Sequence, residues 1–270
     1  MHKSSPKYQR IHKINAQCKI PKVVMQTWKT HEVPEKWKPS IESIHKKMKG
    51  WKHVLNDDED NRNFVKEHFP KFLPYYDKFK YPIQRADAIR YMWLYVHGGL
   101  YLDLDIQVMR NLTPLFNDPA TDSLYFVKSP DSNAFANTVT NAFMASTPKN
   151  PFWLEVLEEM KRPSPLWVKA EYHYYILYST GPLMVNRVLK RQKPHHVILP
   201  KEVFPYSLCN KRFTLYNAWT QPLEGNSWVC GYWAAFNVCY CHSEITILIA
   251  AVVILLIIAL CVEYITTKNI

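Results

Sequence analysis

Residues 82–105 read P-I-Q-R-A-D-A-I-R-Y-M-W-L-Y-V-H-G-G-L-Y-L-D-L-D, and this stretch decides the fold. Apolar residues recur with helical spacing over 84–97. Two glycines follow, and glycine readily takes the left-handed conformation that ends a helix. The chain then turns directly into an apolar strand at 100–102, so we expect a helix that feeds a buried strand.

Helices and strands alternate on both sides of this stretch. We expect strands at 20–28, 51–55, 100–102, 123–128 and 197–199, and helices at 39–50, 61–69, 84–97, 151–160 and 180–190. Such alternation is typical of an α/β fold with a mostly parallel sheet that is covered on both faces.

Two acids, Asp103 and Asp105, come directly after the strand at 100–102. Side chains two positions apart in extended backbone point to the same side, so these carboxylates should be neighbours. In open α/β sheets the ligand crevice lies beyond the carboxyl ends of the strands. Paired carboxylates there suit Mn²⁺ or Mg²⁺, although a D-x-D by itself is common in turns.

The preceding helix adds Asp87 and Arg90, which are three positions apart and therefore on one face. A surface ion pair is the simple interpretation. However, the helix leads straight into the D-x-D strand, so that face can look over the same crevice. A carboxylate beside a guanidinium offers the acceptors and donors that sugar hydroxyls need.

The net charge of +11 is concentrated near the beginning of the chain, where residues 1–52 hold 13 Lys and Arg against three Glu. We expect residues 1–19 to form a flexible basic leader, which suits an anionic lipid surface or is simply a solvated face. Because no groove-reading motif is present, we expect no nucleic-acid partner. The leader lacks an apolar core, so we expect no signal peptide.

Residues 245–262 contain 18 consecutive uncharged, mostly apolar positions. This length matches the hydrocarbon core of a bilayer, and a buried core helix would keep a polar face. We therefore expect a catalytic domain over 20–240, one transmembrane helix over 245–262 and a short tail over 263–270. The segment before the helix is rich in aromatic residues, which would either face a lipid headgroup or pack against the catalytic domain. These residues are Trp219, Trp228, Tyr232, Trp233 and Phe236.

The run at 82–105 resembles the D-x-D glycosyltransferases that include the fungal initiating α-1,6-mannosyltransferases. Five further stretches have counterparts in the same order: I-P-K-V-V-M-Q-T-W-K-T-H-E-V-P-E-K-W (20–37), D-E-D-N-R-N-F-V-K-E-H-F-P-K-F-L-P (58–74), N-A-F-M-A-S-T-P-K-N-P-F (141–152), Y-S-T-G-P-L (178–183) and V-I-L-P-K-E-V-F (197–204). Over about residues 20–230 the chain is most similar to the inositol-phosphorylceramide mannosyltransferases, the catalytic subunits of mannosyl-inositol-phosphorylceramide synthase.

This resemblance implies a GT-A-like fold and a metal-dependent, retaining transfer of mannose from GDP-mannose to an inositol-phosphorylceramide-type sphingolipid. It implies Mn²⁺ or Mg²⁺ as cofactor, and a regulatory membrane subunit is a further partner it suggests. The resemblance implies that Asp103 and Asp105 serve catalysis and bind the metal, with Asp105 the more direct ligand. It implies that Asp87, Arg90 and Asn141 bind the donor sugar. The residues implied for the nucleotide are Gln26, Trp28 and Asp103. Trp28 could equally be a core residue.

The chain departs from the family pattern at three places. It reads Val24-Met25-Gln26 where Ile-His-Gln is common, Ala142 where an aspartate is expected, and Val229 where a histidine is usual. If that histidine helps to hold the metal, Glu224 or Ser227 would have to substitute for it.

Three functions stay open at this point: the lipid mannosyltransferase, the same fold with a UDP-sugar donor or a glycan acceptor, and an inactive membrane adaptor. A Golgi or ER membrane is the expected location. The positive-inside tendency favours a cytosolic catalytic domain, whereas relatives act in the Golgi lumen.

Overall fold

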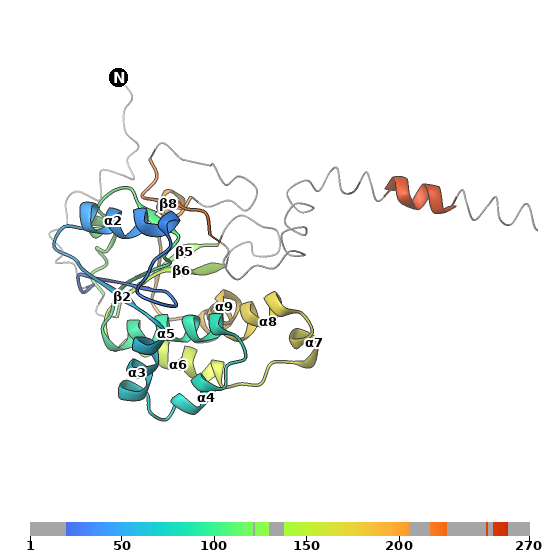
Figure 1. The fold of residues 1–270 in the computed structure, drawn as a ribbon, viewed down its shortest axis with the longest axis horizontal. Helices are drawn as coiled ribbons and strands as arrows, with labels where there is room; N and C mark the ends of the chain where they lie inside the picture. The colour runs from blue at the N-terminus through green and yellow to red at the C-terminus, as the bar shows by residue number, and fades with distance from the viewer. Residues whose placement is uncertain are drawn as a thin grey trace, which may run out of the picture. The chain divides into compact units, whose positions relative to one another are not determined.

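The computed structural model describes residues 20–120, 122–129, 138–205, 217–225, 247 and 251–258. The chain divides into two compact units. The first comprises Met1–Ser207 and Arg212–Gly225, and the second comprises Leu208–Lys211 and Asn226–Ile270. All of the elements named below belong to the first unit (Figure 1).

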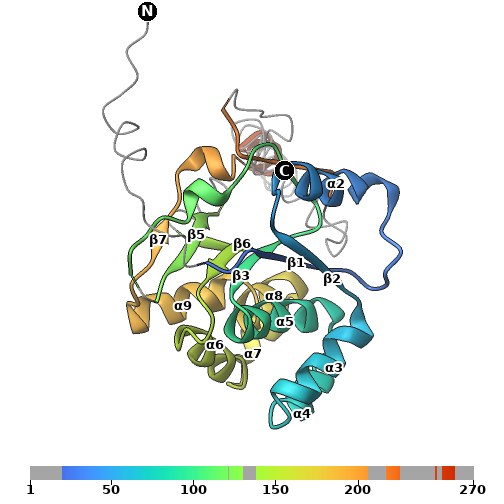
Figure 2. The same cartoon turned by 90° about the vertical axis from the view of Figure 1, so that its left-hand side faces the viewer.

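A six-stranded sheet with the order β2-β1-β3-β6-β5-β7 forms the centre of this unit (Figure 2). Its strands are β1 (Val23–Thr27), β2 (Lys52–Asn56), β3 (Gly99–Leu102), β5 (Leu124–Lys128), β6 (Val139–Ser146) and β7 (Val197–Ile198). The pairs β1–β2, β1–β3 and β5–β7 are parallel, and both pairs that involve β6 are antiparallel. Only β6 therefore runs against the others, which confirms the expected mostly parallel sheet.

Helices cover both faces of the sheet, and Figure 2 shows α2 on one side and the larger helical layer on the other. The helices are α2 (Lys38–Lys47), α3 (Asp58–His68), α4 (Leu73–Asp77), α5 (Pro82–Val96), α6 (Phe152–Met160), α7 (Leu166–Lys169), α8 (Tyr172–Ser179) and α9 (Pro182–Gln192). Short 3-10 helices occupy Glu35–Trp37, Thr113–Leu115 and Lys201–Val203.

Each face of the sheet has its own apolar core. One core packs β-strand residues such as Met25 and Tyr101 against α5, α6 and α9, and the other packs Val24 and Leu100 against α2. The alternation of these neighbours between the two cores follows from the period of two in a strand. Helix α5 is buried over most of its circumference because it lies between the sheet and α6.

Local signals account for the ends of several elements. Asp57 caps α3 by accepting hydrogen bonds from the backbone N–H groups of Glu59 and Asp60. Gly98 and Gly99 have φ angles of 64° and 88°, which confirms that they end α5 in the left-handed region. At Gly99 an added Cβ would also lie 2.5 Å from the Val23 carbonyl oxygen, so the glycine permits the close approach of β3 to β1.

Several elements were not expected from the sequence: the helices α4, α7 and α8, the strand β6, and the small sheet formed by β4 (Ile106–Val108) and β8 (Thr220–Pro222). The expected transmembrane helix lies largely outside the described residues. Of it, 251–258 are helical with exposed side chains. Among the described residues, no helix combines the length and apolarity that a bilayer span requires.

Candidate active site

The D-x-D segment lies at the carboxyl end of β3, as its sequence position suggests. β1 runs parallel to β3, so the residues that follow both strands meet at one edge of the sheet. The backbone N–H of Asp103 donates to the carbonyl of Ala142 on β6 at 2.9 Å. The main chain of position 142 therefore holds the D-x-D segment, and this bond does not depend on which side chain occupies that position.

Arg90 on α5 joins the helix to the D-x-D segment. Its Nη1 donates to Asp103 Oδ1 at 3.0 Å and to the Asn141 carbonyl at 2.9 Å, and its Nε donates to the Ala86 carbonyl at 3.2 Å. The guanidinium lies over the Tyr101 ring at 4.5 Å, and Tyr101 Oη donates to the same Asp103 oxygen at 2.7 Å. Buried and held at these points, Arg90 has a single well-defined position.

Asp87 lies beside Arg90 in the interior, with 3.3 Å between its Oδ1 and Arg90 Nη2. The surface ion-pair interpretation is therefore wrong, because both side chains are buried. Asn141 Nδ2 and Thr180 Oγ1 donate to the two Asp87 oxygens at 2.9 and 2.8 Å. Burial raises the pKa of Asp87, and the Arg90 charge and these donors oppose the rise.

Two hydroxyl-bearing residues complete this network. Asn141 Nδ2 also donates to Tyr91 Oη at 2.8 Å, and Tyr91 Oη donates to the Thr180 carbonyl at 2.8 Å. Thr180 was not expected in the site. Its only sequence signal was its place in the Y-S-T-G-P-L stretch, since nothing local reveals that the end of α8 meets α5.

Asp105 faces a segment that is distant in sequence. The pairing of β4 with β8 brings 223–225 to it, and the Leu223 N–H donates to the Asp105 carbonyl at 2.7 Å. Gly225 lies so close that an added Cβ would stand 1.9 Å from Asp105 Oδ2. Burial, reinforced by the charge of Asp103, raises the pKa of Asp105 to about 7.

The residues expected to complete the metal site fall on this same segment or beyond it. Glu224 is exposed and adjoins Gly225, and its carbonyl accepts from Trp37 Nε1 at 2.6 Å. Ser227 and Val229 lie outside the described residues. The structure thus brings the expected segment to Asp105, and the choice of a further ligand stays a prediction.

Besides Asp103, the residues expected at the nucleotide are Trp28 and Gln26, and their surroundings differ. Trp28 is half-buried at the end of β1 and packs edge-to-face against Trp37, with ring centroids 4.6 Å apart. Gln26 is fully buried, and its Nε2 donates to Ser40 Oγ at 3.0 Å and to the Asp103 carbonyl at 3.3 Å. Gln26 therefore braces the main chain of the D-x-D segment.

His53 on β2 supports Gln26 from the other side, with 3.0 Å between its Nε2 and Gln26 Oε1. Burial, together with the charge of His45, lowers the pKa of His53 to about 4. The ring is therefore neutral at pH 7, and its N–H donates to the amide oxygen, which can only accept.

The donor set at the D-x-D pair fits a hard divalent cation. It consists of carboxylate oxygens. The negative charge of Asp103 helps to raise the pKa of Asp105, and a bound cation would relieve this repulsion between the two carboxylates. Arg90 and Tyr101 both use Oδ1 of Asp103, which leaves the second oxygen for a ligand.

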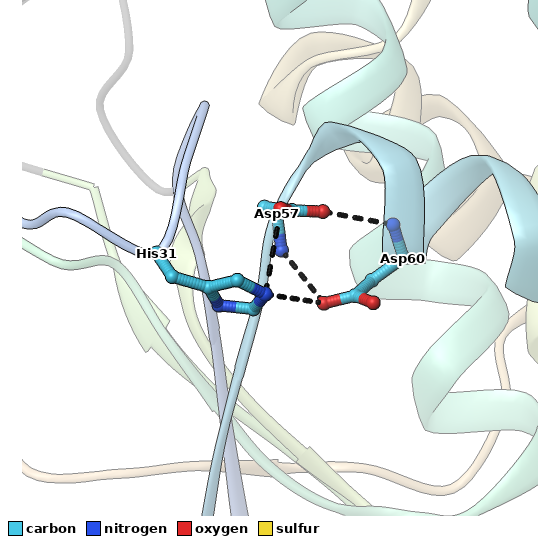
Figure 3. Close-up of side chains that lie close together, drawn as sticks. All are labelled: His31, Asp57 and Asp60. Atoms are coloured by element: carbon cyan, nitrogen blue, oxygen red, sulfur yellow. Dashed lines mark hydrogen bonds and ion pairs between the residues drawn. The ribbon is translucent and has the colours of Figure 1, made fainter.

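A second acidic cluster lies beyond the ends of β1 and β2 (Figure 3). Within the described part of the chain, it is one group of three potential ligands whose atoms lie within 4.8 Å: His31, Asp57 and Asp60. The His31 Nε2 atom lies 3.4 Å from Asp57 Oδ2 and 3.2 Å from Asp60 Oδ2. Both carboxylates already serve the capping box of α3, so helix capping accounts for the grouping.

Comparison with known families and proteins gives a consistent result. Residues 34–124 match the family described as "Glycosyltransferase sugar-binding region containing DXD motif". The chain is 34% identical over 225 residues to inositol phosphoceramide mannosyltransferase 3 of Schizosaccharomyces pombe, covering 79% of this chain and 57% of that protein. It is 37% identical over 174 residues to mannosyl phosphorylinositol ceramide synthase SUR1 of Saccharomyces cerevisiae, covering 64% and 43%.

The chain thus spans about half the length of the curated relatives it matches. Among solved structures, it is similar to the PaToxG glycosyltransferase with a TM-score of 0.47 and 18% identity, covering 64% of this chain and 69% of that one. A mouse xyloside xylosyltransferase 1 structure gives a TM-score of 0.43 and 12% identity, with coverage of 67% and 85%.

Proposed function

We propose that this chain, which belongs to the family of glycosyltransferases with a DXD-containing sugar-binding region, transfers a hexose from a nucleotide sugar to a membrane lipid. The observation that carries the proposal is the buried network joining Asp87, Arg90 and Asn141 to Asp103 at the end of β3. Buried charges are costly unless they are paired, and this network is assembled at the edge where α/β sheets bind ligands.

Asp103 and Asp105 are the residues that would hold Mn²⁺ or Mg²⁺, with Asp105 the more direct ligand. A divalent cation there would neutralise the negative charge that develops on a leaving diphosphate. Glu224 or Ser227 is the proposed further ligand in place of the usual histidine. A GT-A-like arrangement of the donor site is part of this proposal.

The protein's own groups would bind and orient the donor. Arg90 is held by Asp103, Asn141 and Tyr101, so it presents a fixed cation at little cost in conformational entropy. Asp87, Arg90 and Asn141 would contact the donor sugar, and Trp28 the base. Gln26 acts on the nucleotide side by fixing the Asp103 main chain.

The proposed reaction retains the anomeric configuration. The bond between the anomeric carbon and the diphosphate oxygen breaks, and a bond from the acceptor oxygen to that carbon forms on the same face. The departing phosphate oxygen takes the proton of the acceptor hydroxyl, so no protein base is needed.

We propose mannose as the sugar and an inositol-phosphorylceramide-type sphingolipid as the acceptor, because the relatives at 34% and 37% identity carry names for that activity. GDP-mannose is the proposed donor, as the resemblance of the sequence to the mannosyltransferases implies. We also propose an endomembrane of the Golgi or ER as the location, as the family resemblance implies. Residues 245–262 would anchor it as a single-pass protein, and a regulatory membrane subunit is a further proposed partner.

Mass spectrometry of lipids from cells that express the chain tests this function. We expect a new hexosylated sphingolipid with the wild type and none with Asp105→Ala. Asp122→Ala is the matched control, because Asp122 is an exposed acid outside the network, and it should give the same lipid as the wild type.

Two other outcomes would contradict the proposal. Nucleotide release from a sugar nucleotide without a lipid product would indicate a different acceptor. No release from any sugar nucleotide, by folded protein with Mn²⁺, would indicate an inactive adaptor.

A further inference from the structure

The segment formed by α7 and α8, residues 166–179, presents apolar side chains to solvent. Leu166 is 84% exposed and Trp167 is 66% exposed, more than any other large apolar side chain among the described residues of 20–225. Isolated exposed apolar residues are normal on protein surfaces. Leu166 and Trp167 are adjacent, and the burial of the residues that follow them explains why both are exposed.

Helix α7 is anchored so that this pair must point outward. The next residue, Val168, is completely buried, and Pro165 precedes the helix with an extended ψ of 149°. In α8, His173 and Ile176 are buried and fix the second helix against the unit. Leu166 and Trp167 therefore protrude from a segment whose neighbouring residues Val168, His173 and Ile176 are buried.

Aromatic rings extend the exposed pair along α8. The Trp167 ring lies 5.7 Å from the ring of Tyr174 and 6.4 Å from that of Tyr178, centroid to centroid. Arg187 lies over Tyr178 at 3.8 Å. Trp and Tyr side chains with an apolar body and a polar edge are typical of the membrane–water interface.

Charged residues flank the exposed pair on both sides. Lys161 and Arg162 precede it and form ion pairs with Glu158 and Glu159. Lys169 follows it, and Glu171 caps α8 by accepting from the backbone N–H groups of His173 and Tyr174. Lysine and arginine near a bilayer are attracted to anionic headgroups. The combination of the protruding Leu-Trp pair, the tyrosines and the adjacent Lys169 favours a lipid surface over a protein groove.

The far end of α8 belongs to the candidate active site. Ser179 Oγ accepts from Gln84 Nε2 at 2.9 Å, and Thr180 contacts Asp87. A helix of eight residues is about 12 Å long, so a surface held at α7 would lie within the reach of a lipid headgroup from the donor site.

We propose that residues 166–178 insert into the interface of an anionic bilayer and orient the active site toward the lipid acceptor. The orientation of the active site toward a lipid acceptor rests on the proposed function. The insertion of residues 166–178 does not, because insertion needs no catalysis. It gives the catalytic unit its own membrane contact, separate from residues 245–262.

Fluorescence quenching tests insertion directly. An environment-sensitive fluorescent amino acid is placed at position 166 of the full chain, which is reconstituted in phosphatidylcholine vesicles with or without phosphatidylserine. We expect a blue shift and quenching by lipid-borne bromine, stronger with phosphatidylserine. The same probe at Ile198, an exposed apolar position on the edge strand β7, should show neither. Absence of quenching at position 166 in vesicles that carry the chain, or quenching that is equal at both positions, overturns the proposal.

A kinetic measurement separates this inference from the proposed function. The double variant Leu166→Ser and Trp167→Ser should raise the KM for the lipid acceptor in vesicles about tenfold, while the rate of donor hydrolysis stays unchanged. Ile198→Ser should alter neither value. If lipid transfer proceeds with an unchanged KM in the double variant, insertion is refuted and the proposed function stands.

Discussion

Replacing Gly225 with alanine should move the Asp105 carboxylate without unfolding the protein. An ideal Cβ at position 225 lies 1.9 Å from Asp105 Oδ2 and 2.9 Å from Cγ, and real contacts of this kind are not found below 3.0 Å. The carboxylate must therefore retreat by about 1 Å. The clashing atom is the free end of a side chain, and Gly225 is not a residue with positive φ, so the change should cost little stability.

The effect on the site should be much larger than the effect on folding. Misplacing a reacting group by 1 Å can cost about 100-fold in rate, and disturbing the surroundings of a metal ligand costs about 10- to 100-fold in affinity. For Gly225→Ala we therefore expect Mn²⁺ affinity, measured by calorimetry, to fall by about 10- to 100-fold, and donor hydrolysis to fall with it.

Gly50→Ala is the matched control because it should lower stability and leave Mn²⁺ binding unchanged, which is the opposite of what we expect for Gly225→Ala. Gly50 has a φ of 82° and nothing within 4 Å of an added Cβ. Alanine there should cost about 1–2 kcal/mol of stability through backbone strain and leave Mn²⁺ binding unchanged. Normal Mn²⁺ affinity and donor hydrolysis in Gly225→Ala would refute the assignment of Asp105 as a metal ligand in this geometry.

Three further predictions concern the buried network and its charges. Thr180→Val removes one donor to Asp87 and should lower the free energy of unfolding by about 1.5–3 kcal/mol, whereas Thr180→Ser should keep most of it; thermal melting measures both. Arg90→Lys should reduce donor hydrolysis strongly, because lysine cannot reproduce the bonds to Asp103 and the Asn141 carbonyl, and steady-state kinetics equal to wild type would contradict this. The raised pKa of Asp105, about 7, means that without metal the folded chain holds a proton that the unfolded chain releases near pH 4. Its contribution to stability should therefore decline as pH rises from about 4 to 7, while Mn²⁺ binding should strengthen over that range; an Mn²⁺ affinity that is independent of pH would contradict it.

Short-range patterns in the sequence were enough to predict the central part of the fold. The helical spacing in α5, the two glycines and the apolar strand β3 each depend on residues a few positions apart. The D-x-D acids and the pair formed by Asp87 and Arg90 lie within this one segment. Their meeting could therefore be predicted, because a short connection leaves the chain little choice of geometry.

Long-range pairing was not visible in the sequence. Strand β6 runs antiparallel between β3 and β5, and its Asn141 contacts Asp87, which is 54 residues away. The resemblance to a family suggested Asn141, whereas Thr180 had no such assignment. The second half of β6, from Phe143 to Ser146, is buried on both faces, so the strand as a whole lacks the sustained alternation that would identify it.

The sequence alone therefore determined the D-x-D strand, the helix that supplies Asp87 and Arg90, and the α/β class, since these follow from local spacing. Only the tertiary structure decided that Gln26 points inward to Asp103, that β8 brings Gly225 against Asp105, and that Leu166 and Trp167 protrude. These features depend on which distant segments pack together. That choice is made by burial and hydrogen bonding over the whole unit, which no single stretch of sequence encodes.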